Sequence, residues 1–395
     1  MPGDDTGIRA EDAREETAEG VAHVGNRAGL VDHGERELRA TALDLTEAAL
    51  AALSPAAGLR RSVALAGEKL VAGGRSYDLS AVDQLVVLGA GKASAEAAQA
   101  LEQMLGPRLS GGVVVVPRSA GVPTRRVTLM EADHPIPGPA SADGARALLK
   151  EAEDLGEHDL AICVFTGGSS ALASLPPPAV PLADKIRLHQ LLLASGMSIV
   201  EINTIRKHVS AIKGGRLARA IAPARILNLT VSDVVGDLLD CITDPTVQDT
   251  SSVADALSAL REWDLLDRVP TAVRDYLVGC ADAESPDLSD ADIESVLAVR
   301  GEDGSDAVAR AALALDGIHG IVAMFADTDG ADGGTPTAGG LVDWSTSERA
   351  RQSGTSLRKA LVAHGATAIL EECGDAMVTG PTQTNANDLV LILIR

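Results

Sequence analysis

The stretch from Asn203 to Asp237 combines three kinds of residue that together suit a phosphorylated, metal-bound substrate. It reads NTIRKHVSAIKGGRLARAIAPARILNLTVSDVVGD, a basic segment followed by a glycine pair, an apolar run and a loop with two aspartates. Cationic side chains bind phosphate or carboxylate oxygens, and aspartates bind Mg²⁺ or accept a proton from a hydroxyl. The order of residues therefore predicts an anion site beside a carboxylate site.

The basic segment has the spacing of an amphipathic helix. Its apolar residues recur every three or four positions and are expected to face a core: Ile205, Val209 and Ile212. On the neighbouring face, Arg206, Ser210 and Lys213 form a stripe. Together with Lys207 this stripe is either an anion-binding wall or an ordinary solvated basic face. The pair Gly214–Gly215 favours the first, because glycine costs about 1 kcal/mol inside a helix and marks a break or a close approach.

The run from Ile226 to Val231 suits a buried strand that ends just before the two aspartates. Open α/β sheets bind ligands outside the carboxyl ends of their strands. Asp233 and Asp237 are therefore candidate metal ligands. Asp233 is also a candidate base for an acceptor hydroxyl, with capping of a following helix as the structural alternative.

Two further loops follow predicted strands and are rich in small residues. The first is GAGKAS, and its candidate anion-binding residues are Gly89, Gly91, Lys92 and Ser94. A lysine in a glycine turn at a helix start places a positive charge beside unpaired N–H donors, although a tight turn with a solvated lysine explains the same letters. The second loop could cradle phosphate oxygens with its backbone or be a plain turn, and comprises Thr166, Gly167, Gly168, Ser169 and Ser170.

Two loops near the C-terminus carry polar side chains that could reach the same substrate. The loop DTDGADGGT holds three aspartates, Asp329 among them, without matching an EF-hand. It suits either a Mg²⁺-linked role or a structural turn. The loop TGPTQTNAND offers hydroxyls and amides, with Thr382 and Asn385 as candidates, for a polyhydroxy substrate or nucleotide; the alternative is a turn before the last strand.

These loops must be positioned by alternating strands and helices. Strands are expected at 84–88, 112–116, 160–165 and 226–231, with helices at 36–53, 93–105 and 141–155, where Ser141 is a plausible N-cap. Such alternation predicts an α/β fold with a Rossmann-like, doubly wound sheet. Beyond an acidic, proline-containing stretch around 279–292, further strands are expected at 321–325, 368–371 and 389–394, and helix over most of 345–364.

The same patterns divide the chain into three parts. Residues 1–35 are charged and aperiodic and are expected to be a disordered acidic arm. Residues 36–285 are predicted to form the Rossmann-like domain, and residues 290–395 a smaller α/β domain.

Composition excludes several classes of partner. The chain has 395 residues and a net charge of −22, which argues against nucleic acid and anionic membranes as partners. Aromatic residues are only 2%, too few for base-stacking platforms. Four scattered cysteines, no signal-peptide pattern and no apolar run of ~18 residues indicate a cytoplasmic protein.

Taken together, the motifs resemble the class II glycerate kinases, the glycerate 2-kinase family whose C-terminal part is called the MOFRL domain. The matching segments are VVLGAGKAS, EADHPIPGPAS, FTGGSSALASLP, INTIRKHVSAIKGGRLA, LTVSDVVGD, DPTVQD, DTDGADGG and TGPTQTNANDL. The resemblance implies ATP- and Mg²⁺-dependent phosphorylation of D-glycerate at its 2-hydroxyl, in a cleft between two α/β domains. It implies that Lys92 is the catalytic lysine and that Asp233 belongs to the family's SDV-GD loop.

The chain departs from the family at the start of its C-terminal part. Members normally carry a GRNQE-type motif whose arginine is thought to assist phosphoryl transfer, preceded by an SGGE-type element. Here the stretch reads RGEDGSDAVAR, so that the arginine's position falls near Ser305, and the SGGE-type element is missing. Loss of such a cation costs roughly 10³-fold in rate.

Three alternatives to glycerate phosphorylation therefore stay open. The chain could phosphorylate another hydroxy acid or a sugar acid in a biosynthetic pathway, or bind nucleotide and ligand without turnover. A reductase acting on hydroxypyruvate is the third, although GAGKAS lacks the full dinucleotide fingerprint. The oligomeric expectation is a possible homodimer.

Overall fold

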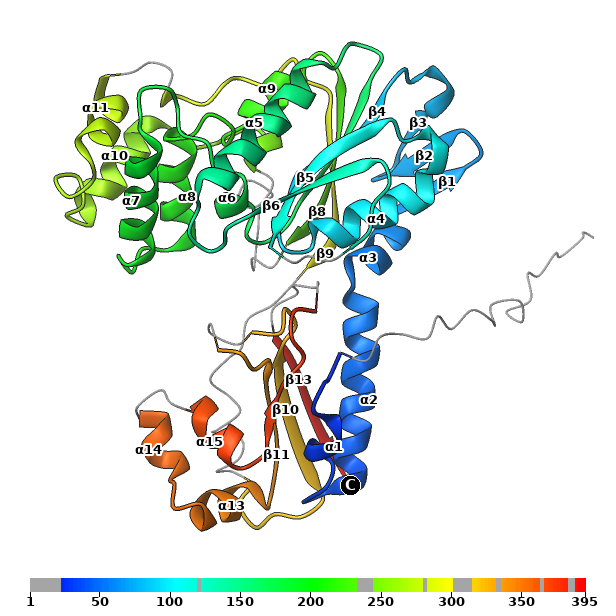
Figure 1. Ribbon diagram of the computed structural model, residues 1–395, viewed down its shortest axis with the longest axis vertical. Helices are drawn as coiled ribbons and strands as arrows, with labels where there is room; N and C mark the ends of the chain where they lie inside the picture. The colour runs from blue at the N-terminus through cyan, green and yellow to red at the C-terminus, as the bar shows by residue number, and fades with distance from the viewer. Residues whose placement is uncertain are drawn as a thin grey trace, which may run out of the picture.

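The protein consists of two α/β halves that lie end to end, with one long helix running along the lower half toward the upper (Figure 1). The computed structural model describes residues 23–118, 122–232, 244–279, 283–300, 315–331, 335–362, 366–382 and 388–395. No described helix is long and apolar enough to cross a membrane.

A six-stranded parallel sheet forms the centre of the N-terminal half. Its spatial order is β6-β5-β4-β7-β8-β9, and every neighbouring pair is parallel. The strands are β4 (Leu85–Ala90), β5 (Gly111–Pro117), β6 (Val127–Ala132), β7 (Leu160–Phe165), β8 (Arg225–Ser232) and β9 (Ile293–Arg300). Counted from β4 this is the order 3-2-1-4-5-6 of a doubly wound sheet, so the predicted fold class is confirmed.

Helices cover both faces of this sheet, as the near-continuous apolar strands require. One face packs against α3 (Pro55–Ser62), α4 (Ser94–Leu105) and a small antiparallel sheet. That sheet comprises β1 (Val63–Ala66), β2 (Lys69–Ala72) and β3 (Arg75–Asp78). The other face packs against α5 (Pro139–Glu153), α6 (Ser169–Leu172) and α9 (Arg216–Ile221).

A cluster of helices with its own core extends this half to one side (Figure 1). It contains α7 (Leu182–Leu193), α8 (Ile199–His208), α10 (Val253–Glu262) and α11 (Thr271–Gly279). A reciprocal capping box between Ser198 and Glu201 fixes the start of α8. This cluster therefore holds α8, the basic helix, beside the parallel sheet.

The C-terminal half is built on a four-stranded antiparallel sheet of order β12-β11-β10-β13. The strands are β10 (Ile321–Asp327), β11 (Gly339–Asp343), β12 (Ala376–Met377) and β13 (Asp388–Ile394). One face is covered by α13 (Thr346–Gln352), α14 (Leu357–Val362) and α15 (Ala366–Glu372). The opposite face packs against α1 (Arg27–Leu30) and α2 (Arg36–Leu53).

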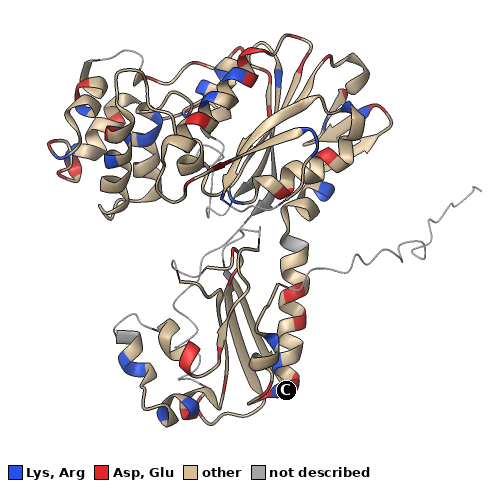
Figure 2. Cartoon of the chain, in the orientation of Figure 1, with Lys and Arg blue, Asp and Glu red and all other residues tan. Residues whose placement is uncertain are grey.

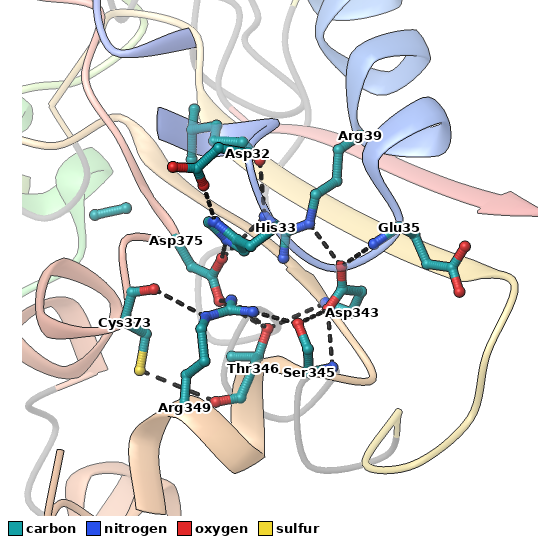
Figure 3. A network of polar contacts seen from close by, with 12 residues as sticks. Asp32, His33, Glu35, Arg39, Asp343, Ser345, Thr346, Arg349, Cys373 and Asp375 are labelled. Atoms are coloured by element: carbon teal, nitrogen blue, oxygen red, sulfur yellow. Dashed lines mark hydrogen bonds and ion pairs between the residues drawn. The ribbon is translucent and has the colours of Figure 1, made fainter. Parts of the chain in front are cut away.

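A buried ionic network ties α2 to this sheet, as Figure 3 shows. Arg39 is fully buried and pairs through Nε with Asp343 at 2.6 Å and through Nη1 with Asp375 at 2.9 Å. Asp375 also pairs with Arg349 and with Nε2 of His33. The fully buried Arg39 and the partly buried Arg349 thus balance two buried carboxylates, which is the condition under which burial of charge is tolerated.

Two predicted domain boundaries shift as a result. Residues 36–53 are the expected helix, but α2 packs on the C-terminal sheet rather than in the first domain. Residues 293–300, which lie in the range predicted for the second domain, form strand β9, and this strand pairs with β8 in the first. Within the expected disordered arm, Val24 and Leu30 are buried against the C-terminal sheet, so residues 23–35 are folded.

Several local predictions also need correction. Residues 368–371 form part of helix α15, not a strand, and the helix expected over 345–364 is broken at Ser353 and Gly354. Ser141 is the third residue of α5 rather than its N-cap; its Oγ accepts from the N–H of Gly138, which is the cap. Ser141 therefore still closes the helix start, but from inside the first turn.

Candidate active site

The candidate site is organised around the switch point of the parallel sheet. β4 and β7 are neighbours, and the chain continues from β4 to β5 on one side and from β7 to β8 on the other. In such sheets ligands bind at the carboxyl ends of these two strands. The loop with Lys92 follows β4 and the loop Thr166–Ser170 follows β7, so the sheet brings both predicted loops to one place.

The two loops interlock through hydrogen bonds. Oγ1 of Thr166 accepts from the N–H of Ala93 at 3.1 Å and lies 3.2 Å from Oγ of Ser94. The N–H of Lys92 donates to the carbonyl of Gly167 at 2.9 Å. A Cβ on Gly91 would lie 2.0 Å from Oγ1 of Thr166. The second glycine is therefore required for the loops to approach, which explains the residue type that the sequence offers there.

Lys92 reaches from this double loop to the C-terminal half. Its Nζ lies 2.7 Å from Oδ2 of Asp329, in the loop after β10. The other oxygen of Asp329 accepts from the N–H of Ala331 at 2.9 Å, and Asp327 Oδ1 accepts from the N–H of Asp329. The side chain of Lys92 is about one-third exposed to solvent in this ion pair. Two predicted site residues from opposite halves are thus in direct contact.

Thr382, another candidate residue of the sequence, lies beside Asp329. Its N–H donates to the carbonyl of Asp329 at 3.4 Å, and its hydroxyl donates to the carbonyl of Thr328. A Cβ on Gly330 would lie 2.0 Å from the carbonyl oxygen of Gly380. The two C-terminal loops are therefore packed backbone to backbone, and this packing holds Thr382 beside Asp329.

His134 is a further residue at this point and is not among the residues predicted from the sequence. A Cβ on Gly168 would lie 3.0 Å from its Cδ2 and Nε2 and 3.3 Å from Cγ of Lys92. Burial, and next the positive charge of Lys92, lower the pKa of His134 to about 4, so the imidazole is neutral at neutral pH. Its position in EADHPIPGPAS, two residues after the strand that ends at Ala132, is the signal that could have identified it.

Two predicted cations form a buried wall on the β7 side. Lys213 is 2% exposed, and its Nζ donates to Oγ of Ser170 at 2.9 Å. Arg206 is 6% exposed and lies 3.3 Å from Nε2 of His189. Burial, and next the positive charge of Arg206, lower the pKa of His189 to about 3. The wall therefore keeps its positive charge on arginine and lysine rather than on histidine.

The predicted helical stripe does not exist in the form expected. α8 ends at His208, and Oγ of Ser210 accepts from the N–H of Lys213 in a turn, at 3.2 Å. The glycines after Lys213 both have positive φ, and Gly215 caps α9. Lys213 reaches Ser170 because the chain turns between α8 and α9. A continuous helix would instead have placed Lys213 on the same face as Arg206.

Lys207 is the predicted site residue that the structure directs elsewhere. Its Nζ pairs with Oδ1 of Asp249 at 3.0 Å, and both side chains are almost completely buried. Burial opposes ionisation of Asp249, but hydrogen bonds from Ser285 and Ser251 together with Lys207 hold the pKa of its carboxyl below the usual value. This pair fastens α8 to the segment before α10.

Asp233, Asp237 and Asn385 lie outside the described residues. Among those that are described, no group of three or more His, Cys, Asp or Glu side chains could hold a metal ion. Mg²⁺ in phosphoryl-transfer sites needs only one or two carboxylates, since substrate phosphates and water complete its shell. Asp329, with its neighbour Asp327, fits that requirement.

The geometry defines a two-domain α/β protein with interlocked small-residue loops at a sheet switch point and a lysine that contacts the second domain. Family models identify the class further: the domain of unknown function DUF4147 matches residues 41–278, and the MOFRL family matches residues 294–388. The chain is 32% identical to D-glycerate 2-kinase of Thermotoga maritima, over 79% of this chain and 91% of that protein. It belongs to the glycerate 2-kinase (MOFRL) family.

Other relatives carry different names. Glycerate 2-kinase of Pyrococcus horikoshii is 28% identical over 91% of this chain and 98% of its own length. A protein of Agrobacterium vitis, provisionally named a hydroxypyruvate reductase, is 33% identical over 78% of this chain and 99% of its own. The crystal structure of the Thermotoga maritima glycerate kinase covers 91% of this chain and 100% of its own, with a TM-score of 0.74 at 26% identity.

Proposed function

We propose that the protein transfers the γ-phosphoryl group of ATP to a small hydroxy acid, with D-glycerate as acceptor and 2-phosphoglycerate as product. The relatives named as glycerate 2-kinases support the reaction class. The observation that carries the proposal is the contact between Lys92 Nζ and Asp329 at 2.7 Å, at the carboxyl ends of β4 and β7. It places a cation where loops from both halves meet.

Phosphoryl transfer depends on positioning and on stabilising charge on the transferred group. We assign that charge stabilisation to Lys92, whose Nζ would exchange the carboxylate of Asp329 for phosphate oxygens when nucleotide binds. The backbone of Gly167 and Gly168 allows those oxygens a close approach. Mg²⁺, bound with the nucleotide, would neutralise further phosphate charge, and Asp329 and Asp327 are its candidate ligands.

The acceptor is proposed to bind on the β7 side of the site. Lys213 and Arg206 are buried cations that suit a carboxylate or phosphate, and Ser170 offers a hydroxyl 2.9 Å from Lys213. The resemblance to the family assigns orientation or deprotonation of the acceptor hydroxyl to Asp233, with Asp237 as a second metal-binding carboxylate. Asn385 remains a proposed contact to nucleotide or acceptor.

A direct test uses purified protein, ATP, Mg²⁺ and D-glycerate, with the product identified by phosphorus NMR. We expect 2-phosphoglycerate to appear in step with ADP. A panel of other hydroxy acids and sugar acids distinguishes the divergent-acceptor alternative. Nucleotide-induced thermal stabilisation without any product on this panel would instead support a non-catalytic binding protein, and would contradict the kinase proposal.

The reductase alternative is less consistent with the loop after β4. A dinucleotide site needs its third glycine for close packing of helix and strand. Here Ser94 occupies that position, and its hydroxyl donates to the carbonyl of Val164 at 3.1 Å. We therefore prefer a phosphate-binding role for this loop, and the absence of NAD(P)H oxidation with hydroxypyruvate is the expected result.

We further propose a cytoplasmic protein that acts on small molecules rather than on nucleic acid. Cys163 and Cys373, the free cysteines among the described residues, are both buried, which suits a reducing compartment. The net charge of −22 disfavours polyanionic partners. A homodimer is also proposed.

A further inference from the structure

Arg118 is a cation at the carboxyl edge of the parallel sheet that has no role in the site described above. It directly follows β5, the neighbour of β4, and both strands run toward the same edge. The N–H of Gly91, beside Lys92, donates to the carbonyl of Val115 in β5 at 3.1 Å. The loop that carries Lys92 is thus bonded to β5 three residues before Arg118.

An ion pair fixes the base of the Arg118 guanidinium. Its Nε donates to Oδ1 of Asp133 at 2.8 Å. Asp133 comes directly after β6 and directly before His134, whose ring lies in the site against Gly168. Arg118 is therefore attached to a residue of the site through one ion pair and one peptide bond.

The carboxylate of Asp133 is itself held at the start of α5. A Cβ on Gly138, the N-cap of that helix, would lie 2.8 Å from Oδ2 of Asp133, so glycine leaves room for the carboxylate. The N-terminus of a helix also stabilises a nearby negative charge. Asp133 is therefore a fixed anchor, and it orients the side chain of Arg118.

The outer part of this guanidinium is available to a ligand. The side chain of Arg118 is 61% exposed, and within the described residues its Nη groups have no hydrogen-bond partner. A guanidinium has five N–H donors, and Nε supplies only one of them. The remaining planar fork matches the oxygens of a phosphate group.

The order of the strands indicates which part of a nucleotide would meet Arg118. Along the carboxyl edge, β5 with Arg118, β4 with Lys92 and β7 with Ser170 follow in that order. The proposed acceptor site, where Lys213 contacts Ser170, lies on the β7 side. In-line phosphoryl transfer places the acceptor oxygen and the leaving oxygen on opposite sides of the phosphorus. With Lys92 at the transferred group, the leaving diphosphate therefore extends toward β5.

We propose that Arg118 binds the diphosphate of the nucleotide, an inference that rests on the proposed kinase function. As the acceptor oxygen bonds to the γ-phosphorus, the bond to the β,γ-bridging oxygen breaks and negative charge accumulates on ADP. The acceptor proton passes to the proposed base, Asp233. The Nη groups of Arg118 stabilise the leaving diphosphate, whereas Lys92 stabilises the transferred group.

A local cation is needed here because the protein as a whole is acidic. The net charge is −22, and Figure 2 shows acidic residues over both halves, including α2. Such a charge distribution repels ATP, which is itself a polyanion, unless positive charge is placed at the binding site. Arg118 supplies positive charge on the side of Lys92 that is opposite to Lys213.

The nucleotide affinity of matched variants tests this role without requiring turnover. Arg118→Met removes the cation after the carboxyl end of β5. Arg108→Met is the control, because Arg108 lies just before the amino end of the same strand, where its Nε pairs with Glu68 at 2.9 Å. By isothermal titration calorimetry with Mg²⁺, we expect Arg118→Met to bind ADP about 10-fold more weakly and adenosine like wild type. Arg108→Met should bind both like wild type.

Kinetics of the same variants separate nucleotide binding from a purely structural role. Arg118→Met should raise KM for ATP but not KM for D-glycerate, with little change in Tm, because an exposed ion pair contributes little to stability. Asp133→Asn, which keeps Arg118 but weakens its anchor, should raise KM for ATP to a smaller extent. Arg118→Lys, which keeps the charge without the fork, should recover part of the ADP affinity.

Equal ADP affinity of Arg118→Met and wild type would overturn the proposal, and so would a rise in KM for D-glycerate alone. A wild type that binds ADP without phosphorylating any hydroxy acid would contradict the kinase function, while the ADP affinities of the variants would still decide the role of Arg118. A wild type that binds no nucleotide would contradict both proposals.

Discussion

At the residue scale, His134 is an uncharged residue of the proposed site that is able to donate a hydrogen bond. Its ring lies against Gly168 and beside Lys92, and its pKa of about 4 keeps it neutral. A neutral imidazole can donate a hydrogen bond to a phosphate oxygen without adding charge. It can also be a spacer that holds Lys92 in place. These two roles require different atoms, so substitutions can distinguish them.

If His134 donates a hydrogen bond, His134→Gln should keep kcat within several-fold, whereas His134→Phe, which keeps the ring but loses the donor, should lower it by about 10- to 100-fold. The measurement is kcat and KM for ATP over pH 6–8, where wild type should show no inflection from this group. His158→Phe, at an exposed position, is the control. Equal activity of His134→Phe and wild type would leave only the spacer role.

Glu96 lies in the first turn of α4, and its environment predicts that the free energy of unfolding depends on pH. Burial raises the pKa of its carboxyl to about 7, and no hydrogen-bond partner of Oε2 is found within the described residues. The folded state therefore favours the protonated form, and the stability from this group is lost as pH rises from 4.5 through 7.

Glu96→Gln should consequently raise the free energy of unfolding at pH 8 by on the order of 1 kcal/mol, a value discounted because the side chain is partly exposed. At pH 4 the two proteins should be nearly equal. Urea denaturation at both pH values measures the difference. A variant that is no more stable than wild type at pH 8 would show that Glu96 finds a partner when ionised.

At the element scale, hydrophobic periodicity predicted the long helices and strands whose pattern is set by burial. It failed for short elements and for breaks that depend on a local turn. The helix at 36–53 and the strands at 160–165 and 226–231 are found within one residue of the predicted bounds, because each is long and uniformly patterned. Ala368–Glu371 was predicted as a strand but lies in α15, since a short apolar run fits either period. The break after α8 depends on Ser210 hydrogen bonds, which no periodicity contains.

The interlocked loops after β4 and β7 give a prediction for the element that carries Lys92. Gly91 has φ +144°, and a Cβ there would lie 2.0 Å from Oγ1 of Thr166. Gly91→Ala should destabilise the protein by about 2 kcal/mol or more and separate the loops, lowering kcat/KM as well. Gly279→Ala is the control, because its added Cβ would meet no atom within 4 Å among the described residues beyond its chain neighbours and its own helix. Equal thermal stability of the two variants would contradict the interlock.

At the scale of the whole molecule, each half contains an element from the other side of the boundary that composition predicts. The match to the first family model ends at residue 278 and the match to the second begins at residue 294, close to that boundary. The chain nevertheless packs α2 on the C-terminal sheet and β9 in the N-terminal one. Composition marks where a linker is polar, but only long-range packing decides which sheet a helix covers. For the same reason, the sequence alone could place Lys92 and Asp329 in one proposed site but could not establish their contact across 237 positions.

The buried network around Arg39 should hold α2 against the C-terminal sheet. Arg39→Met leaves Asp343 and Asp375 buried without this cation (Figure 3), and loss of one partner of a buried pair costs about 3–5 kcal/mol. Arg351→Met, which removes exposed pairs with Asp316 and Glu348, should cost less than about 1 kcal/mol. Differential scanning calorimetry of both variants measures this contrast, and comparable losses would contradict a structural role for the network.

The central claim is that Lys92 stabilises a phosphoryl group in transfer to a hydroxy acid. The most direct measurement compares ATP-dependent phosphorylation of D-glycerate by wild type, Lys92→Met and Lys69→Met, the last an exposed lysine of β2. We predict 2-phosphoglycerate from wild type and Lys69→Met, and a kcat/KM lower by about 10³-fold for Lys92→Met. Equal turnover by Lys92→Met and wild type, or no turnover by folded wild type with any hydroxy acid, would contradict this claim.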